Sequence, residues 1–255
     1  MKKVRIGLIG FGKAGKLVAD EFLKEELFSL EWVIRRTGSD HNVYASRQLG
    51  YEFDLGRLVA IDEIDGDFAE NHPVDALVDF SNSRGAALYE KLVRAGVPIV
   101  TAISNYEPEQ IEVLQQLSKS SPVLYSPNIT LGINVLMVAA QIIQKIVPHA
   151  DIEIVEEHFK AKEEISGTAK KIAGALDLTP EKHINSIRVG GIVGRHEIIF
   201  GLPNQTIRLS HESISRAAFG QGAIFAVKSI LGQPAGMYSM ENIVAEMFRN
   251  NIPVY

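Results

Sequence analysis

Cysteine is absent from this chain of 255 residues. Disulfide frameworks, thiolate metal sites and thiol nucleophiles are therefore excluded, and the absence fits a reducing compartment. Hydrophobic runs are short, and none approaches the roughly 20 apolar residues that a membrane-spanning helix needs. The N-terminal residues enter a strand pattern directly, without a signal-peptide pattern. We therefore expect a cytoplasmic protein without a membrane segment and without a metal site.

An excess of positive charge is absent as well. The chain carries 26 Lys and Arg against 31 Asp and Glu, which gives a net charge of −5. Nucleic-acid-binding surfaces usually appear as a basic excess, so we expect a small-molecule partner and no nucleic acid. The apolar fraction of 46% and the charged fraction of 22% are those of a globular protein. The length allows one large domain or two small ones.

A glycine-rich turn between a strand and a helix is the clearest local pattern in the first half. Residues 4–9 form an apolar strand, the turn follows, and an amphipathic helix begins after it. In a G-x-G-x-x-G fingerprint the first glycine makes the turn, the second lets a pyrophosphate approach the backbone, and the third allows close helix packing. A glycine-rich turn without a ligand is the alternative. The expected cofactor-binding residues of this turn are Gly10, Phe11, Gly12, Lys13, Ala14 and Gly15.

Two arginines follow the second predicted strand, which spans residues 30–34. In dinucleotide-binding folds this position lies beside the adenosine ribose, and an acidic residue there favours NAD. Arg35 and Arg36 occupy it here. Their planar guanidiniums match the oxygens of a 2′-phosphate, so we expect both to bind NADPH, with NADH as the less favoured cofactor. A solvated basic turn is the alternative.

Strands and helices alternate through the rest of the first half. Strands are predicted at 74–80, 97–101 and 122–125 and helices at 84–95 and 108–118, while residues 36–67 give the weakest pattern. This alternation predicts an α/β fold, a Rossmann-type doubly wound parallel sheet with ligands at the carboxyl ends of its strands. The candidate cofactor-binding residues at these ends are Phe80, Ser81, Thr101, Ala102, Ile103 and Asn128.

The second half has a different pattern, in which strands cluster. Helices are predicted at 131–147, from Ser166 or Thr168 to 176, at 216–231 and at 238–248, and strands at 152–157, 186–193, 196–201 and 206–213. Clustered strands predict a second, α+β domain with an open mixed sheet. An uncovered face of such a sheet favours self-association.

Residues 156–171 bring several reactive groups together in sixteen positions. They supply an imidazole at His158, an ammonium at Lys162 and a Ser166-Gly167-Thr168 turn at the start of a predicted helix. The first N–H groups of a helix lack intrahelical partners and attract carboxylates or phosphates. A proton donor, a cation and an anion-binding turn are what the reduction of an anionic imine or enone needs. A solvated polar loop with a surface histidine is the alternative.

Several motifs occur together along most of the chain. The most specific is Glu-x-His-x-x-x-Lys at residues 156–162, followed by Ser-Gly-Thr. The others are the glycine turn and residues 78–81, 128–135, 188–196 and 211–223. In this combination the chain resembles the 4-hydroxy-tetrahydrodipicolinate reductases, also called dihydrodipicolinate reductases.

The resemblance implies an NADPH-dependent reductase of a cyclic imine dicarboxylate, acting on 4-hydroxy-tetrahydrodipicolinate in lysine and diaminopimelate biosynthesis. It implies that His158 and Lys162 are catalytic and that Ser166, Gly167 and Thr168 bind a substrate carboxylate. It also implies a homotetramer assembled through the sheet of the second domain, and a last helix that returns to the nucleotide domain. The expected domains are a dinucleotide-binding domain at 1–129 and 239–255 and a substrate-binding and oligomerisation domain at 130–238.

The chain departs from the usual family pattern at four places. Phe159 replaces a second histidine, Ile129 a phenylalanine, Glu163-Glu164-Ile165 an Asp-Ala-Pro, and Thr101-Ala102-Ile103-Ser104 a Gly-Thr-Thr-Gly. One lost donor and two added carboxylates would weaken dianion binding by about 1–3 kcal/mol if the carboxylates point inward. Three interpretations remain: the lysine-pathway reductase, a relative that reduces another imine or keto acid, and a regulatory nucleotide-binding protein without catalysis.

Overall fold

The computed structural model describes residues 2–36, 44–251 and 253. Contacts divide the chain into two compact units, Met1–Thr130 with Phe219–Ile243, and Leu131–Ala218 with Val244–Tyr255. We refer to them as the first unit and the second unit. No helix in the described part of the chain is long and apolar enough to cross a membrane.

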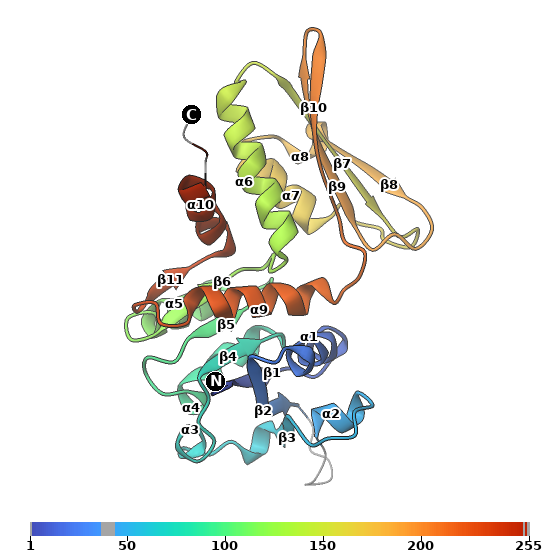
Figure 1. Cartoon of the computed structure of the whole chain (residues 1–255). Coiled ribbons are helices and arrows are strands. Elements are labelled where there is room, and N and C mark those ends of the chain that lie inside the picture. Colours follow the sequence, from blue (N-terminus) through green and yellow to red (C-terminus); the bar gives the residue numbers. More distant parts are fainter. Residues whose placement is uncertain (1, 37–43, 252, 254–255) are drawn as a thin grey trace. The chain divides into compact units, whose positions relative to one another are not determined.

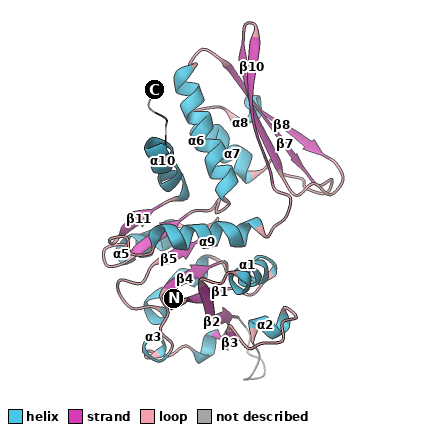
Figure 2. Ribbon diagram, viewed as in Figure 1, coloured by secondary structure: helices cyan, strands magenta, loops and turns pink. Residues whose placement is uncertain are grey.

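Within the described residues, the first unit contains a seven-stranded sheet whose strands all run parallel (Figure 1, Figure 2). The order β11-β6-β5-β4-β1-β2-β3 is that of the doubly wound dinucleotide-binding fold with one strand added. The predicted Rossmann-type sheet is therefore confirmed. The strands are β1 (Val4–Ile9), β2 (Phe28–Arg35), β3 (Arg57–Ala60), β4 (Ala76–Asp79), β5 (Ile99–Thr101), β6 (Pro122–Tyr125) and β11 (Gly236–Tyr238).

Helices of very different length connect these strands. The long ones are α1 (Lys13–Lys24), α5 (Pro108–Leu117) and α9 (Ala218–Ile230), and the short ones are α2 (Ala45–Gln48), α3 (Phe68–Asn71) and the 3-10 helix η1 (Ile61–Glu63). The helix expected at 84–95 is instead a 3-10 helix, η2 (Ser83–Leu88), followed by a single turn, α4 (Tyr89–Leu92). A Cβ at Gly85 would lie 2.3 Å from Asp79 Oδ2, so the segment needs a glycine, which disfavours a regular helix.

The contact division groups α9 with the first unit. Residues 219–238 cluster with the first unit, although the sequence assigned them to the second domain. Two glycines explain the packing: a Cβ at Gly220 would lie 2.6 Å from the Glu21 side chain of α1, and a Cβ at Gly222 would lie 2.2 Å from Ile129 O. The strand β11, which the sequence pattern does not predict and which overlaps the predicted last helix (238–248) only at Tyr238, pairs with β6. It is three residues long, too short to give a pattern.

The second unit has a mixed sheet of order β10-β9-β7-β8, whose four strands are labelled in Figure 1. β7 (Asp151–His158) runs parallel to β8 (Ile184–Arg188) and antiparallel to β9 (Arg195–Leu202), which pairs antiparallel with β10 (Gln205–Glu212). The predicted open mixed sheet is thus confirmed. Helices α6 (Leu131–Ile146), α7 (Gly167–Ala175) and α8 (Pro180–His183) complete it, and the contact division falls inside α10 (Met240–Asn251), which the sequence placed in the nucleotide domain.

The alternation of side chains along β7 determines what this unit buries. Every second residue is buried, which places Ile152 and Ile154 on one face of the strand together with the polar Glu156 and His158. The two isoleucines belong to an apolar core that includes Ile172 of α7. The same face of one strand therefore begins in the core and ends in a buried polar group.

Candidate active site

A buried histidine and a buried carboxylate lie side by side at the end of β7. Glu156 is 0% exposed and His158 is 8% exposed. They are two positions apart in a strand, so both side chains project to the same face. His158 Nδ1 makes a short hydrogen bond to Glu156 Oε2. The bond fixes the orientation of the imidazole ring.

The carboxylate of Glu156 is surrounded by donors. Arg188 donates to both of its oxygens, Nη1 to Oε2 at 2.9 Å and Nη2 to Oε1 at 2.5 Å. Ser186 Oγ donates to Oε1 at 2.6 Å, and the backbone N–H of Ser166 donates at 3.3 Å. Burial alone would raise the pKa of Glu156, but Arg188, Ser186, His158 and Ser166 outweigh it and lower the pKa to about 2. Glu156 is therefore ionised at neutral pH.

Ser166 is the N-cap of α7, and it is one of the two alternatives that the sequence predicted. Its Oγ accepts from Ala169 N at 3.5 Å and lies 3.0 Å from His196 Nε2. Gly167 and Thr168 form the first turn, where Gly167 is exposed and Thr168 is half-buried. The helix N-terminus thus presents backbone N–H groups and a positive dipole end, which fit a carboxylate.

The loop that carries Lys162 is held by Arg188. The guanidinium donates from Nε to Lys162 O at 2.9 Å and from Nη2 to Glu164 O at 2.9 Å. Lys162 itself is half-buried, whereas Glu163 and Glu164 are exposed. Exposure leaves both added carboxylates open to solvent screening, which limits their effect on a bound dianion.

His196 is a second buried imidazole in this cluster, and the sequence interpretation gave it no chemistry. It is 5% exposed, and its ring lies 5.4 Å from that of His158 in an edge-on arrangement. Burial, and then the nearby His158, lower its pKa to about 4, so His196 is neutral at neutral pH. The alternation of β9 could have shown that it shares a buried face with Ile198 and Phe200, but the register that pairs it with Glu156 is visible only in the structure.

The glycine turn of the first unit has the geometry that a pyrophosphate site needs. Gly10 has a φ of 98°, and a Cβ there would lie 2.7 Å from Phe80 O. A Cβ at Gly15 would lie 2.1 Å from Gly10 O, so α1 packs directly on the turn. At Gly12 a Cβ would meet no protein atom within 4 Å, which leaves its backbone open to a ligand. These three glycines therefore fit a dinucleotide at the start of α1.

The remaining candidates of the first unit lie at the carboxyl ends of neighbouring strands. Arg35 ends β2 and is half-buried, and Arg36 is exposed behind it. Thr101 and Ile103 are buried, and Thr101 Oγ1 lies 2.8 Å from Tyr106 Oη. Buried side chains of this kind leave the backbone to make any cofactor contact. The other candidates range from half-buried to exposed: Phe11, Lys13, Ala14, Ser81, Ala102 and Asn128.

A buried carboxyl group lies beneath these strand ends. Asp79, the last residue of β4, is 0% exposed and accepts hydrogen bonds from Ser81 N at 2.7 Å and Tyr89 Oη at 2.6 Å. Tyr89 Oη lies 2.9 Å from Tyr106 Oη, and Tyr106 Oη lies 2.8 Å from Thr101 Oγ1, which extends the network to β5. Burial raises the pKa of Asp79 although both hydroxyl partners lower it. The sequence interpretation did not single out Asp79.

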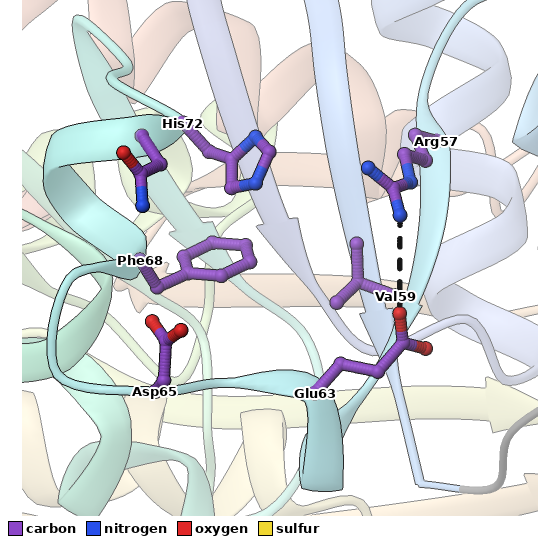
Figure 3. Close-up of a pocket in the computed structure, with 7 residues that line it drawn as sticks. Arg57, Val59, Glu63, Asp65, Phe68 and His72 are labelled. Carbon is purple, nitrogen blue, oxygen red and sulfur yellow. Dashed lines mark ion pairs between the residues drawn. The ribbon is translucent and has the colours of Figure 1, made fainter.

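A pocket elsewhere in the first unit contains none of the predicted residues (Figure 3). Its ion pair joins Arg57 Nη2 and Glu63 Oε2 at 3.9 Å. Charges of both signs line it, and no catalytic combination is apparent among them. The lining residues are Arg57, Val59, Glu63, Asp65, Phe68, Asn71 and His72.

Comparison with known proteins identifies a family for both halves of the chain. The family model "Dihydrodipicolinate reductase, N-terminus" matches residues 4–129, and "Dihydrodipicolinate reductase, C-terminus" matches residues 132–244. A 4-hydroxy-tetrahydrodipicolinate reductase of Caldanaerobacter subterraneus subsp. tengcongensis is 35% identical over 67% of this chain and 76% of its own. The corresponding protein of Thermosipho africanus is 32% identical over 96% of this chain and 100% of its own.

A solved structure shares the fold. The dipicolinate-bound dihydrodipicolinate reductase from Paenisporosarcina sp. TG-14 has a TM-score of 0.76 at 20% identity, covering 95% of this chain and 100% of its own. The family models together cover nearly all of the chain, and the relatives extend over both units. The chain therefore belongs to the dihydrodipicolinate reductase family of oxidoreductases.

Proposed function

We propose that this protein reduces 4-hydroxy-tetrahydrodipicolinate, a cyclic imine dicarboxylate, to tetrahydrodipicolinate in lysine and diaminopimelate biosynthesis. The reaction consumes NADPH and a proton and releases water. The observation that carries the proposal is the buried pair of His158 and Glu156 beside the Ser166 helix N-terminus, in a chain of this family. Two relatives bear the name of this reductase, and a solved neighbour has dipicolinate bound.

In this proposal each site residue of the second unit has its own role. The turn formed by Ser166, Gly167 and Thr168 holds one carboxylate of the substrate, because the start of α7 is electropositive. His158 supplies the proton, since a positioned imidazole is the side chain that most often acts as a general acid. Lys162 stabilises the negative charge that develops on the ring. The reduced nicotinamide, when bound, supplies the hydride.

The first unit binds the cofactor in this proposal. Gly10, Gly12 and Gly15 accommodate the pyrophosphate, and Arg35 with Arg36 contact the 2′-phosphate of NADPH. An acidic side chain, which would favour NADH, is not found at either position. NADPH is therefore the preferred cofactor and NADH the weaker one.

The second unit also assembles the protein in this proposal. Strand alternation leaves the face of the sheet opposite Glu156 uncovered by α6 and α7, and Ile187 on that side is 43% exposed. Glu197 is buried there between Arg195 and Arg208. We propose a homotetramer that covers this face and resides in the cytoplasm, in agreement with the absence of cysteine. Light scattering of the purified protein measures the subunit number.

A relative with the same chemistry on another imine or keto acid is the second candidate. Phe159 and the pair Glu163-Glu164 favour it, because they change the surroundings of a dianionic substrate. The third interpretation, a nucleotide-binding protein without catalysis, is set aside because the chain belongs to a family of oxidoreductases.

A substrate panel scored by NADPH oxidation tests the proposal. Enzymatically made 4-hydroxy-tetrahydrodipicolinate is expected to give the highest kcat/KM, ahead of monocarboxylic cyclic imines and open-chain keto acids. A higher kcat/KM for another compound would favour the second candidate. NADPH binding without oxidation of NADPH by any compound would contradict both.

A further inference from the structure

The proposed catalytic histidine is connected to the rest of its site through one buried ion pair. Glu156 contacts His158 through Oε2 and the N–H of Ser166 through Oε1, and Arg188 contacts both oxygens. The same guanidinium holds the backbone oxygens of Lys162 and Glu164. Every element of the proposed site, the imidazole, the anion-binding turn and the loop of the lysine, is thus attached to this pair.

We propose that the Glu156–Arg188 ion pair is a positioning element that sets the tautomer of His158 and holds the turn and loop around it. This inference rests on the proposed function. It assigns roles to two residues outside the proposed catalytic and substrate-binding set, which act through the members of that set.

The tautomer follows from the hydrogen bond. Glu156 is ionised, so it only accepts, and His158 Nδ1 must carry the hydrogen of the bond between them. This leaves His158 Nε2 as the nitrogen that exchanges a proton with a ligand. A carboxylate that orients a histidine in this way also stabilises the imidazolium without itself taking the proton.

Gly194 keeps space free beside the proton-exchanging nitrogen. A Cβ added at this position would lie 3.0 Å from His158 Nε2. Its φ is not in the left-handed region, so the backbone itself does not demand a glycine there. The missing side chain is therefore explained by the nitrogen it would crowd.

The stability of the fold gives little reason to keep this ion pair. Burying two charges costs desolvation energy, and well-packed apolar residues in their place are often neutral or stabilising. An apolar residue at position 156 would continue the Ile152 and Ile154 face of β7. The presence of a charged pair at this position agrees with a role in positioning rather than in folding.

A pair of glutamate variants separates positioning from general structure. Glu156→Gln is expected to lower kcat about 100-fold or more while the KM for NADPH stays within about twofold, because the amide cannot stabilise an imidazolium. Glu157→Gln is the matched control: Glu157 is the next residue, points to the other face and pairs with Arg195 at 2.5 Å. Equal effects of the two substitutions would overturn the proposal.

A double-mutant cycle tests whether Glu156 acts through His158. In a His158→Gln background, Glu156→Gln is expected to lower kcat by less than about threefold further, since residues that act as a unit are not additive. A further loss of about 100-fold would show an independent structural role and overturn the proposal.

Gly194→Ala decides the question if Glu156→Gln does not fold. It is expected to lower kcat about tenfold or more with an unchanged thermal midpoint, because the added methyl group crowds Nε2. Gly191→Ala, where a Cβ meets nothing within 4 Å, should leave kcat within about twofold. Equal kcat values for the two alanine variants would contradict the assignment of Nε2.

Failure of the proposed function can be distinguished from failure of this inference. If the wild-type protein oxidises no NADPH with the proposed substrate, the function fails. The inference is then tested by the binding of pyridine-2,6-dicarboxylate. Glu156→Gln should weaken it about tenfold relative to Glu157→Gln, because the turn at Ser166 loses its anchor. Equal affinities would overturn the inference.

Discussion

Among the described residues, each of the two units buries one carboxyl group completely, and the pKa values of the two groups shift in opposite directions. Asp79 at the end of β4 and Glu156 near the end of β7 are both 0% exposed. Asp79 has neutral partners, the hydroxyls of Ser81 and Tyr89, and burial raises its pKa. Glu156 faces a guanidinium, and its pKa falls to about 2. Burial alone therefore does not decide the charge of a carboxyl group; its partner does.

The difference between the partners of the two carboxyl groups matches the proposed role of each unit. The first unit is an apolar parallel sheet that supports a cofactor, and a hydroxyl network around Asp79 links the ends of β4 and β5 without a formal counter-charge. The second unit performs the proposed proton transfer, and an ionised Glu156 stabilises the positive charge that His158 carries as a donor. Four experiments test this comparison.

The largest effect is expected from removing the imidazole. His158→Gln should lower kcat about 1,000-fold, within the range of general acid catalysis, while the Kd for NADPH stays within about twofold. Lys162→Met should likewise lower kcat and spare the cofactor. The exposed His149 and Lys160, changed in the same way, are the controls. Steady-state rates and NADPH fluorescence titration measure both quantities, and equal losses in both would contradict the separation of tasks between the units.

The next effect concerns stability against pH. The lowered pKa of Glu156 contributes stability above about pH 4.5 that is lost as the pH falls towards 2, so the advantage of wild type over Glu156→Gln should shrink by about 2 kcal/mol between pH 6 and pH 3. The raised pKa of Asp79 has the opposite effect on stability. The free energy of unfolding of Asp79→Asn should rise relative to that of the wild type as the pH rises above about 4. Urea unfolding at several pH values measures both differences. If the two stability differences change with pH in the same direction, the comparison is refuted.

Two glycines of one turn should respond differently to a methyl group. Gly15→Ala places its Cβ against Gly10 O and should lower stability by about 1–3 kcal/mol. Gly12→Ala meets no protein atom, so its thermal midpoint should stay close to that of the wild type while the NADPH affinity falls about tenfold. Thermal melts and cofactor titrations distinguish the two. An unchanged NADPH affinity in Gly12→Ala would argue against a pyrophosphate at this turn.

The smallest effect is expected at the end of β2. Replacing Arg35 and Arg36 together with Ala should weaken NADPH binding about tenfold, which is about 1.4 kcal/mol, and leave NADH binding within about twofold. Arg47→Ala, which removes an exposed arginine from the same unit, is the control. Equal losses for both cofactors would reject the 2′-phosphate assignment.

The parallel sheet was predictable because its strands are short apolar runs separated by helical or turn patterns. β11 was not predictable, because three residues are too few to show a period. The 3-10 form of η2 was not predictable either, because it depends on the close contact between Gly85 and Asp79. The place of α9 was missed for a related reason. A helix pattern shows which face is apolar, but not which unit its glycines will touch.

The candidate active site was predictable only in part. His158, Lys162 and the turn at Ser166 stand close together in the sequence, whereas Arg188 and His196 come more than 20 residues later. The β7–β8 register places Arg188 opposite His158, and a single chain does not show such pairing. Glu156 was part of the predicted motif but received no role, because a carboxylate in an alternating strand is usually solvated until a distant cation pairs with it.

The transfer of deuterium from NADPH labelled at both C4 positions tests the central claim most directly. With enzymatically made 4-hydroxy-tetrahydrodipicolinate, the wild-type protein should give tetrahydrodipicolinate about one mass unit heavier, in step with NADPH oxidation. His158→Gln should bind the cofactor and give almost no labelled product. Unlabelled product, or equal label from both proteins, would contradict a hydride transfer that depends on the buried imidazole of the second unit.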